Sequence, residues 1–164
     1  MIALGVDSGS LSTGYGVVKS EGSLHRALEY GAIRNDPKTP HPERLAIIYR
    51  KLREVISRFR PDLLALEEVF VSQNVQSALK LGQVRGAVMV AAAEEGIPVV
   101  ELAPNTVKAA VTGHGHADKA QVQFMVKAIL GLKVEPKPHD AADALALAIC
   151  ALNRELRFPA GGKP

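Results

Sequence analysis

Four acidic residues stand at positions where packing does not readily explain a carboxylate: Asp7, Glu67, Asp140 and Asp143. Asp7 and Glu67 each end an apolar stretch that is predicted to be a strand, and functional groups of α/β sheets gather beyond such strand ends. Asp140 and Asp143 are three residues apart at the start of a predicted helix, so they share one helix face. A carboxylate at the end of an apolar element costs desolvation free energy unless a partner compensates it. A bound cation is such a partner.

Hard divalent cations fit this set of donors, because Mg²⁺ and Mn²⁺ prefer carboxylate and water oxygens. Two ions about 3.5–4 Å apart can hold a scissile phosphate, activate the attacking water and stabilise the leaving oxygen. That chemistry needs no Ser, Cys or Lys nucleophile. The four carboxylates therefore favour a metal-dependent phosphodiester hydrolase with two Mg²⁺ ions per site, for which Mn²⁺ can substitute.

Each carboxylate taken alone has a simpler interpretation. Asp140 can cap a helix and interact with its dipole, and Asp7 can form the turn that follows it. Glu67 and Glu68 can be the solvated end of a strand. Only the joint occurrence of these residues at the ends of apolar elements favours a site, and the simpler interpretations stay open at this point.

The elements that must position these residues follow from apolar periodicity and from Pro and Gly. Short turns join three early strands, at 2–6, 15–18 and 25–33, which is typical of an antiparallel meander. Pro42 opens a helix that runs to Arg60. The remaining predicted elements are a buried strand at 62–67, a helix capped by Ser72 and reaching Glu95, a strand at 98–102, and helices at 104–111, about 118–130 and about 139–156.

This order predicts an α/β fold in which helices flank both faces of a five-stranded mixed sheet. We expect a single domain over residues 1–157 and a flexible C-terminal tail over residues 158–164, because the tail is rich in Gly and Pro.

Composition favours a polyanionic partner. The chain of 164 residues has 20 basic and 17 acidic residues, a net charge of +3. Setting aside the four carboxylates that cations would cover leaves 13 acidic residues and a balance of +7. The single cysteine, Cys150, excludes an intrachain disulfide and favours a reducing compartment. The N-terminus has no basic leader, and apolar runs such as 87–93 are far shorter than the roughly 18 residues that span a bilayer. We therefore expect a cytoplasmic protein without a membrane segment.

Over nearly its whole length the sequence resembles the RuvC family of Holliday-junction resolvases. Four stretches carry the resemblance, and the third and fourth are highly specific: Gly5-Val-Asp7-Ser-Gly with Thr13-Gly-Tyr-Gly, Ala65-Leu-Glu67-Glu-Val-Phe70, Ser77-Ala-Leu-Lys-Leu-Gly-Gln-Val-Arg85-Gly, and His139-Asp140-Ala-Ala-Asp143-Ala-Leu-Ala. Asp7, Glu67, Asp140 and Asp143 fall on the four acidic positions of the family. Two departures are that Ser8 replaces the usual Pro of an Asp-Pro-Gly turn and that Glu68 stands where relatives often carry Gln.

The resemblance implies an RNase H-like nuclease domain and a crossover junction endodeoxyribonuclease that acts in homologous recombination and DNA repair. It implies a homodimer that nicks two opposed strands of a four-way DNA junction symmetrically and leaves 5′-phosphate and 3′-hydroxyl ends. It also implies Mg²⁺ dependence and cooperation with a branch-migration complex of RuvA and RuvB type proteins.

The candidate DNA contacts lie between Glu67 and Asp140 in the sequence. In the family an aromatic residue at the position of Phe70 stacks on bases near the crossover, although Phe70 between two valines is also compatible with a core role. Lys108 and Lys119 resemble family lysines that hold phosphates, whereas isolated lysines are usually solvated. Lys80 and Arg85 on the long helix are further phosphate candidates, and such contacts position a substrate without reading its sequence.

Two glycines on the long helix, Gly82 and Gly86, permit a close backbone approach, either to the sheet or to a second subunit. A two-fold junction needs two active sites, so we favour a dimer contact. His114 and His116 lie in a Gly-rich loop without further ligands, which favours a structural or phosphate-facing loop over zinc.

Three other functions compete with this interpretation. An actin-like ATPase or sugar kinase also begins with strand-Asp-x-Gly, but it needs a second domain for which this chain is too short. An RNase H-like nuclease that acts on RNA is the main alternative, and the specific stretches above argue against it. A catalytically inactive junction-binding module is disfavoured because all four acidic residues are present.

Overall fold

The computed structural model describes residues 1–69 and 74–157. The predicted Phe70 contact, the predicted Ser72 cap and the predicted tail at 158–164 lie outside the described residues. Among the helices that are described, none is long and apolar enough to cross a membrane.

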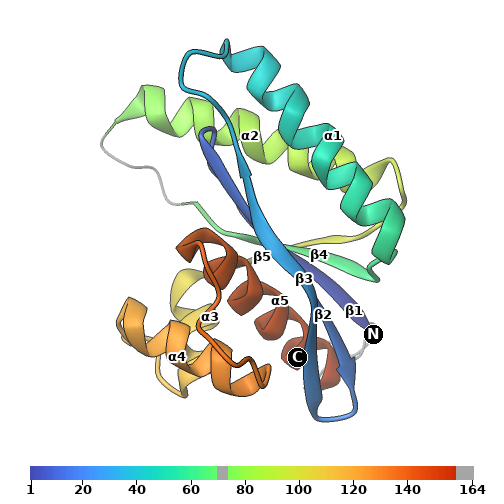
Figure 1. Ribbon diagram of the computed structural model, residues 1–164, viewed down its shortest axis with the longest axis vertical. Helices are drawn as coiled ribbons and strands as arrows, with labels where there is room; N and C mark the ends of the chain where they lie inside the picture. The colour runs from blue at the N-terminus through green and yellow to red at the C-terminus, as the bar shows by residue number, and fades with distance from the viewer. Residues whose placement is uncertain (70–73, 158–164) are drawn as a thin grey trace.

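The strands form one mixed sheet in the order β3-β2-β1-β4-β5, shown in Figure 1. The first three strands pair antiparallel, and β4 and β5 continue the sheet in parallel from β1. This confirms the predicted antiparallel meander and the five-stranded mixed sheet. The strands are β1 (Ile2–Asp7), β2 (Ser12–Glu21), β3 (Leu24–Arg34), β4 (Leu63–Glu67) and β5 (Val99–Leu102).

The second strand is much longer than the predicted 15–18. Its first three residues, Ser12, Thr13 and Gly14, pair with the end of β3 although their types are typical of a turn. Ser12 and Thr13 pair with β3, and Gly14 pairs with both β1 and β3; this pairing outweighs the weak strand preference of Ser and Gly.

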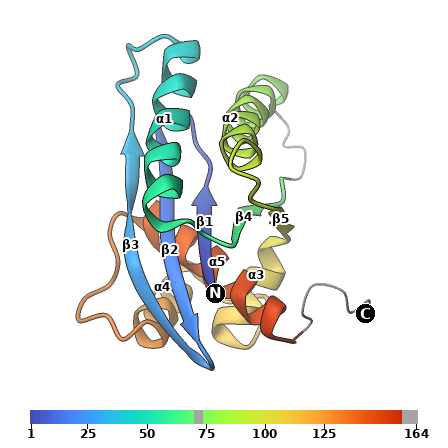
Figure 2. The same cartoon turned by 90° about the vertical axis from the view of Figure 1, so that its right-hand side faces the viewer.

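Helices cover both faces of the sheet, as predicted (Figures 1 and 2). One face carries α1 and α2, and the other carries α3, α4 and α5, with a hydrophobic core on each side. The helices are α1 (His41–Phe59), α2 (Val75–Ala93), α3 (Pro104–Thr112), α4 (Lys119–Ile129) and α5 (His139–Arg157).

The starts of α2 and α4 are fixed by side-chain caps. The cap residue of α2 is Asn74, whose side chain accepts a hydrogen bond from the backbone NH of Ser77, so the helix begins at Val75, later than the sequence predicts. Asp118 and Gln121 form a reciprocal capping box at α4, which places Lys119 at the first position of that helix.

Candidate active site

The alternation of β1 and β4 turns two carboxylates to the same face of the sheet. In β1, Ala3 packs in the core beside α5 while Leu4 and Val6 pack beside α1 and α2, so Asp7 points toward α5. In β4, the same alternation from Leu63 turns Glu67 toward α5. The two strands are parallel neighbours and Val6 pairs with Leu66, so Asp7 and Glu67 lie next to each other at the strand ends.

Two glycines let α5 lie directly on this part of the sheet. A Cβ atom at Gly5 would overlap the carbonyl oxygen of Ala144, and one at Gly14 would overlap the backbone of Asp140. The absence of side chains there allows a close helix–strand approach. The approach brings the first turn of α5, with Asp140 and Asp143, to the end of β1.

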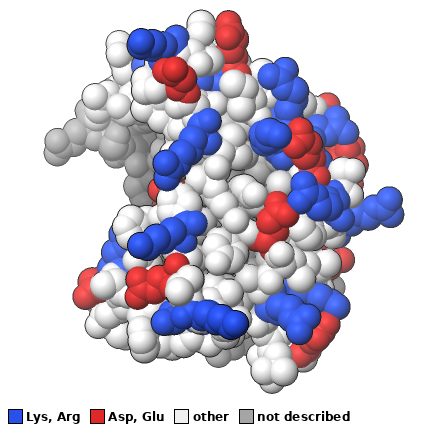
Figure 3. All heavy atoms as spheres, viewed as in Figure 1, with Lys and Arg blue, Asp and Glu red and all other residues white. Residues whose placement is uncertain are grey.

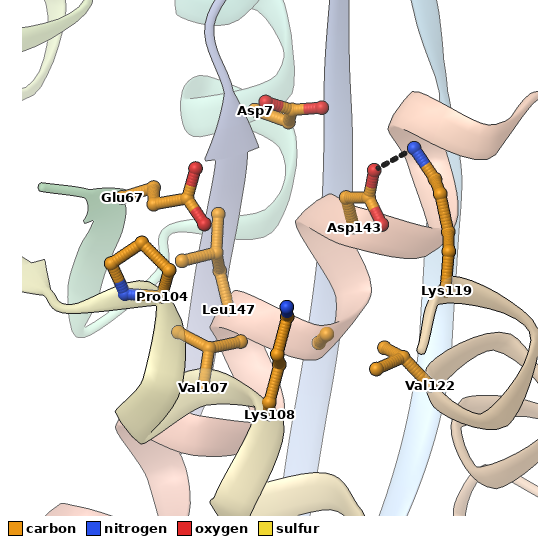
Figure 4. Close-up of a pocket in the computed structure, with 10 residues that line it drawn as sticks. Asp7, Glu67, Pro104, Val107, Lys108, Lys119, Val122, Asp143 and Leu147 are labelled. Carbon is orange, nitrogen blue, oxygen red and sulfur yellow. Dashed lines mark ion pairs between the residues drawn. The ribbon is translucent and has the colours of Figure 1, made fainter. Parts of the chain in front are cut away.

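A pocket of about 230 Å³ opens between these elements. Figure 4 shows Asp7, Glu67 and Asp143 around it, with Lys108 from α3 and Lys119 from α4 on the other sides. The floor is apolar and includes Val107, Val122 and Leu147. Carboxylates and ammonium groups from five elements therefore converge above a hydrophobic base.

Three ionised carboxylates without a bound cation are unfavourable in this pocket. Burial raises the pKa of Asp7 from 3.8 to about 7, and the charges of Asp143, Asp140 and Glu67 contribute to this rise against the opposing Lys119. Burial and Asp143 also raise the pKa of Glu67, while Lys108, Arg85 and Lys119 lower it. The negative charge is thus only partly compensated by the protein, which is the environment that a divalent cation stabilises.

Two of the four carboxylates are held by protein partners. Asp143 forms an ion pair of 2.9 Å with Lys119, drawn as a dashed line in Figure 4. Asp140 accepts a hydrogen bond from the hydroxyl of Ser12 and does not line the pocket, although its charge acts on Asp7. Within residues 1–69 and 74–157, no three acidic, His or Cys side chains already stand at metal-ligand spacing. The donors are assembled at one place, but side-chain rotation is needed to bring them around one ion.

The basic residues that were predicted to contact DNA lie in three different environments: the pocket, the surface and the interior. Lys108 and Lys119 line the pocket, and Lys80 is exposed on α2. Arg85, another predicted phosphate contact, has a side chain that is only 11% exposed. Its two terminal nitrogens donate to the backbone carbonyl of Glu67 and to the carboxylate of Glu101.

Sequence reasoning missed Ser12 and Glu101. Ser12 lies in a Gly- and Ser-rich stretch that is typical of a turn, and nothing in that pattern indicates contact with residue 140. Glu101 is one acidic residue in a short strand, and only the strand pairing shows that it faces α2.

Three comparisons with known proteins, by family model, by sequence and by structure, all match this chain to the same family. A family model described as crossover junction endodeoxyribonuclease RuvC matches residues 3–151. The crossover junction endodeoxyribonuclease RuvC of Chlorobium phaeovibrioides is 53% identical over 155 residues, which cover 94% of this chain and 82% of the relative.

Solved structures give the same result. The RuvC structure of Thermus thermophilus superposes with a TM-score of 0.88 at 42% identity, covering 96% of this chain and 97% of the other. T. thermophilus RuvC in complex with a Holliday junction substrate gives a TM-score of 0.92 at 41% identity, with 96% of both chains covered. These matches confirm the RNase H-like fold that was expected from the sequence.

Proposed function

Because the chain belongs to the RuvC family of crossover junction endodeoxyribonucleases, we propose that it resolves four-way DNA junctions by metal-dependent hydrolysis of phosphodiester bonds. One observation within the chain carries the proposal. Strand alternation and the close approach of α5 gather four carboxylates around the ends of β1 and β4, where burial and mutual repulsion raise the pKa of Asp7 to about 7.

Asp7, Glu67, Asp140 and Asp143 would hold two Mg²⁺ ions, or Mn²⁺ in their place, since all four present hard oxygen donors. Bound ions of this kind activate water and stabilise the charge on the leaving oxygen. The chain itself supplies the orientation: Asp7 and Glu67 are fixed on adjacent strands, and Asp143 is fixed on a helix packed against them. The apolar floor under the pocket excludes water from one side of the site.

Lys108 and Lys119 would bind the phosphates on either side of the scissile bond. Both line the pocket from helices outside the carboxylate cluster. Lys119 lies at the first position of α4, and its ammonium reaches Asp143. An incoming phosphodiester offers this ammonium a second acceptor, so Lys119 can bridge substrate and site.

The net charge does not by itself provide a uniform DNA-binding face. Figure 3 shows Lys and Arg side chains spread over the α1–α2 half and the α3–α5 half of one face, interspersed with acidic ones. Phosphate affinity therefore depends on particular cations such as Lys80, Lys108 and Lys119. Phe70 remains the proposed base-stacking residue near the crossover, where aromatic stacking is worth about 1–3 kcal/mol per base.

A homodimer would place two such sites on a two-fold symmetric junction. The outer side of α2 carries exposed apolar residues at helical spacing, with Val75 66%, Leu79 63% and Val90 51% exposed. On the same side, a Cβ atom at Gly82 or Gly86 would meet nothing within 4 Å. Packing against the sheet does not explain these glycines, so we propose that this face of α2 contacts its copy in a second subunit.

Paired nicks at symmetric positions would leave 5′-phosphate and 3′-hydroxyl ends, and a branch-migration complex of RuvA and RuvB type would deliver the junction. A synthetic junction with each strand labelled in turn tests the paired cuts. We expect nicks at equivalent positions in two opposed strands and full sealing by DNA ligase in Mg²⁺. Nicks in one strand only, or ends that ligase cannot seal, would refute this part of the proposal. Cleavage of RNA in preference to the junction would establish the alternative nuclease.

A further inference from the structure

Arg85 is a buried cation on the inner side of α2. Its side chain is 11% exposed, whereas its partner Glu101 is 46% exposed. One terminal nitrogen donates to the backbone carbonyl oxygen of Glu67, and the other donates to the carboxylate of Glu101. A buried guanidinium is stable only when it is paired and hydrogen-bonded, so these two acceptors determine where it lies.

Arg85 reaches Glu67 from the opposite face of the sheet. The side chain of Glu67 points into the pocket on the α5 side, while Arg85 belongs to the core beside α2. Alternation in β5 turns Leu102 toward the α5 side and therefore Glu101 toward α2, which completes the bridge. The guanidinium thus joins β4, β5 and α2 at the level of the pocket without entering it.

Glu67 is the last residue of β4, so its backbone has limited support from the sheet. The next residue, Glu68, donates its NH to the carbonyl of Leu102 at 2.9 Å. The carbonyl of Glu67 is held by Arg85. The carbonyl of Glu67 and the NH of Glu68 belong to one peptide group, so without Arg85 this group keeps only the hydrogen bond to Leu102. Its orientation, and with it the direction of the adjoining Glu67 side chain, is then less firmly fixed.

We propose that Arg85 is a positioning residue that fixes the main chain of Glu67 and thereby aims its carboxylate at the metal site. The inference rests on the proposed function of that site. Removing a group that orients a metal ligand without touching the metal typically lowers metal affinity or activity about 10–100-fold. The role replaces the direct phosphate contact expected of Arg85 from the sequence.

Arg85→Met tests the proposal, because Met keeps an unbranched apolar stem and removes every donor. Mn²⁺ binding is measured by electron paramagnetic resonance on the full-length protein without DNA, beside thermal unfolding in EDTA. We expect Mn²⁺ affinity to fall roughly 10–100-fold, and junction cleavage to recover as Mn²⁺ is raised to saturation. Junction affinity in EDTA should stay within about twofold of the wild type, since a positioning residue does not touch the phosphates.

Two matched variants separate positioning from general stability. Glu101→Gln removes the ion pair but keeps an acceptor for Arg85, so Mn²⁺ affinity should change less than about threefold. Arg53→Met removes another arginine that pairs from α1 with two glutamates just past the end of α2, Glu94 and Glu95. This arginine contacts no residue of the site. The substitution should lower thermal stability and leave Mn²⁺ affinity unchanged.

Wild-type Mn²⁺ affinity in folded Arg85→Met would overturn the proposal. So would weaker junction binding in EDTA at unchanged Mn²⁺ affinity, which would make Arg85 a phosphate contact. If Arg85→Met does not fold, Arg85→Lys decides in the same way, because one ammonium cannot reproduce the two-pronged contact. Failure of the proposed metal site is recognised separately, by equal Mn²⁺ binding in the wild type and in Asp7→Asn.

Discussion

Replacing Asp7 by Asn is expected to stabilise the metal-free protein even though it removes a proposed metal ligand. Burial and the charges of Asp143, Asp140 and Glu67 raise the pKa of Asp7 from 3.8 to about 7. The unfolded chain releases this proton near pH 4, whereas the folded chain keeps it until about pH 7. Between these values the unfolded state binds fewer protons, so the free energy of unfolding falls as the pH rises.

The magnitude follows from the shift. The pKa of Asp7 rises by about three, and each pKa unit is worth about 1.4 kcal/mol, so the ionised carboxylate destabilises the folded protein by ~4 kcal/mol above pH 7. Relaxation and partial solvent access reduce this, and we expect Asn, a neutral isostere, to recover about 2–4 kcal/mol at pH 8. About 2–3 kcal/mol of the difference should develop between pH 5 and pH 8, which for a chain of this size is roughly 5–10 °C in Tm.

Thermal unfolding in EDTA at pH 5, 6, 7 and 8 measures the effect for the wild type and for Asp7→Asn. Glu43→Gln, which neutralises an exposed carboxylate on α1, is the matched control and should show no growing difference. Mg²⁺ added at pH 8 should stabilise the wild type more than the variant, and Mn²⁺ binding to the wild type should tighten from pH 6 to pH 8 because Asp7 must lose its proton. A variant no more stable than the wild type at pH 8, or a difference that is constant across the pH range, would refute this reasoning.

Four further results are expected. Gly14→Ala should cost about 1–3 kcal/mol of stability and displace Asp140, because a Cβ there overlaps the α5 backbone; unchanged thermal unfolding and cleavage would contradict the close approach. Gly86→Leu should shift the hydrodynamic mass from dimer to monomer, and an unchanged dimer would exclude that face of α2. Lys119→Met should lower the slope of log affinity for the junction against log salt concentration by about one, the change expected when one phosphate is no longer neutralised, and an unchanged slope would rule out phosphate binding by Lys119. Burial raises the pKa of the Cys150 thiol to about 11, so a thiol reagent at pH 8 should modify the native protein at least roughly 100-fold more slowly than the unfolded protein.

The carboxylate cluster is predictable from sequence where simple periodicities govern side-chain direction. The apolar stretches at 2–6 and 63–66 are enough to place Asp7 and Glu67 at strand ends, and helical spacing is enough to place Asp140 and Asp143 on one face. The order of the strands was not predicted, so their adjacency depended on the structure. Only the pairing of β1 with β4 shows that the first two carboxylates are neighbours.

The surroundings of Arg85 and Ser12 cannot be predicted from the sequence for a common physical reason: residue type and local pattern do not reveal long-range partners. Arg85 has the sequence features of a surface cation, but two long-range acceptors stabilise it in the interior. Ser12 has those of a turn residue, but strand pairing extends β2 over it and aims its hydroxyl at Asp140. Partners that lie 16 to 128 residues away in sequence determine these roles, and no local pattern indicates them.

Cleavage of a labelled synthetic four-way junction, compared with a linear duplex of the same sequence, tests the central claim most directly. The wild type and Asp7→Asn are assayed in Mg²⁺, in Mn²⁺ and in EDTA, with binding measured in the same samples. We predict that the wild type cuts the junction and not the duplex, only with a metal, and that Asp7→Asn binds the junction without cutting it. Cleavage by the wild type in EDTA, undiminished cleavage by Asp7→Asn, or equal cutting of junction and duplex would contradict the account.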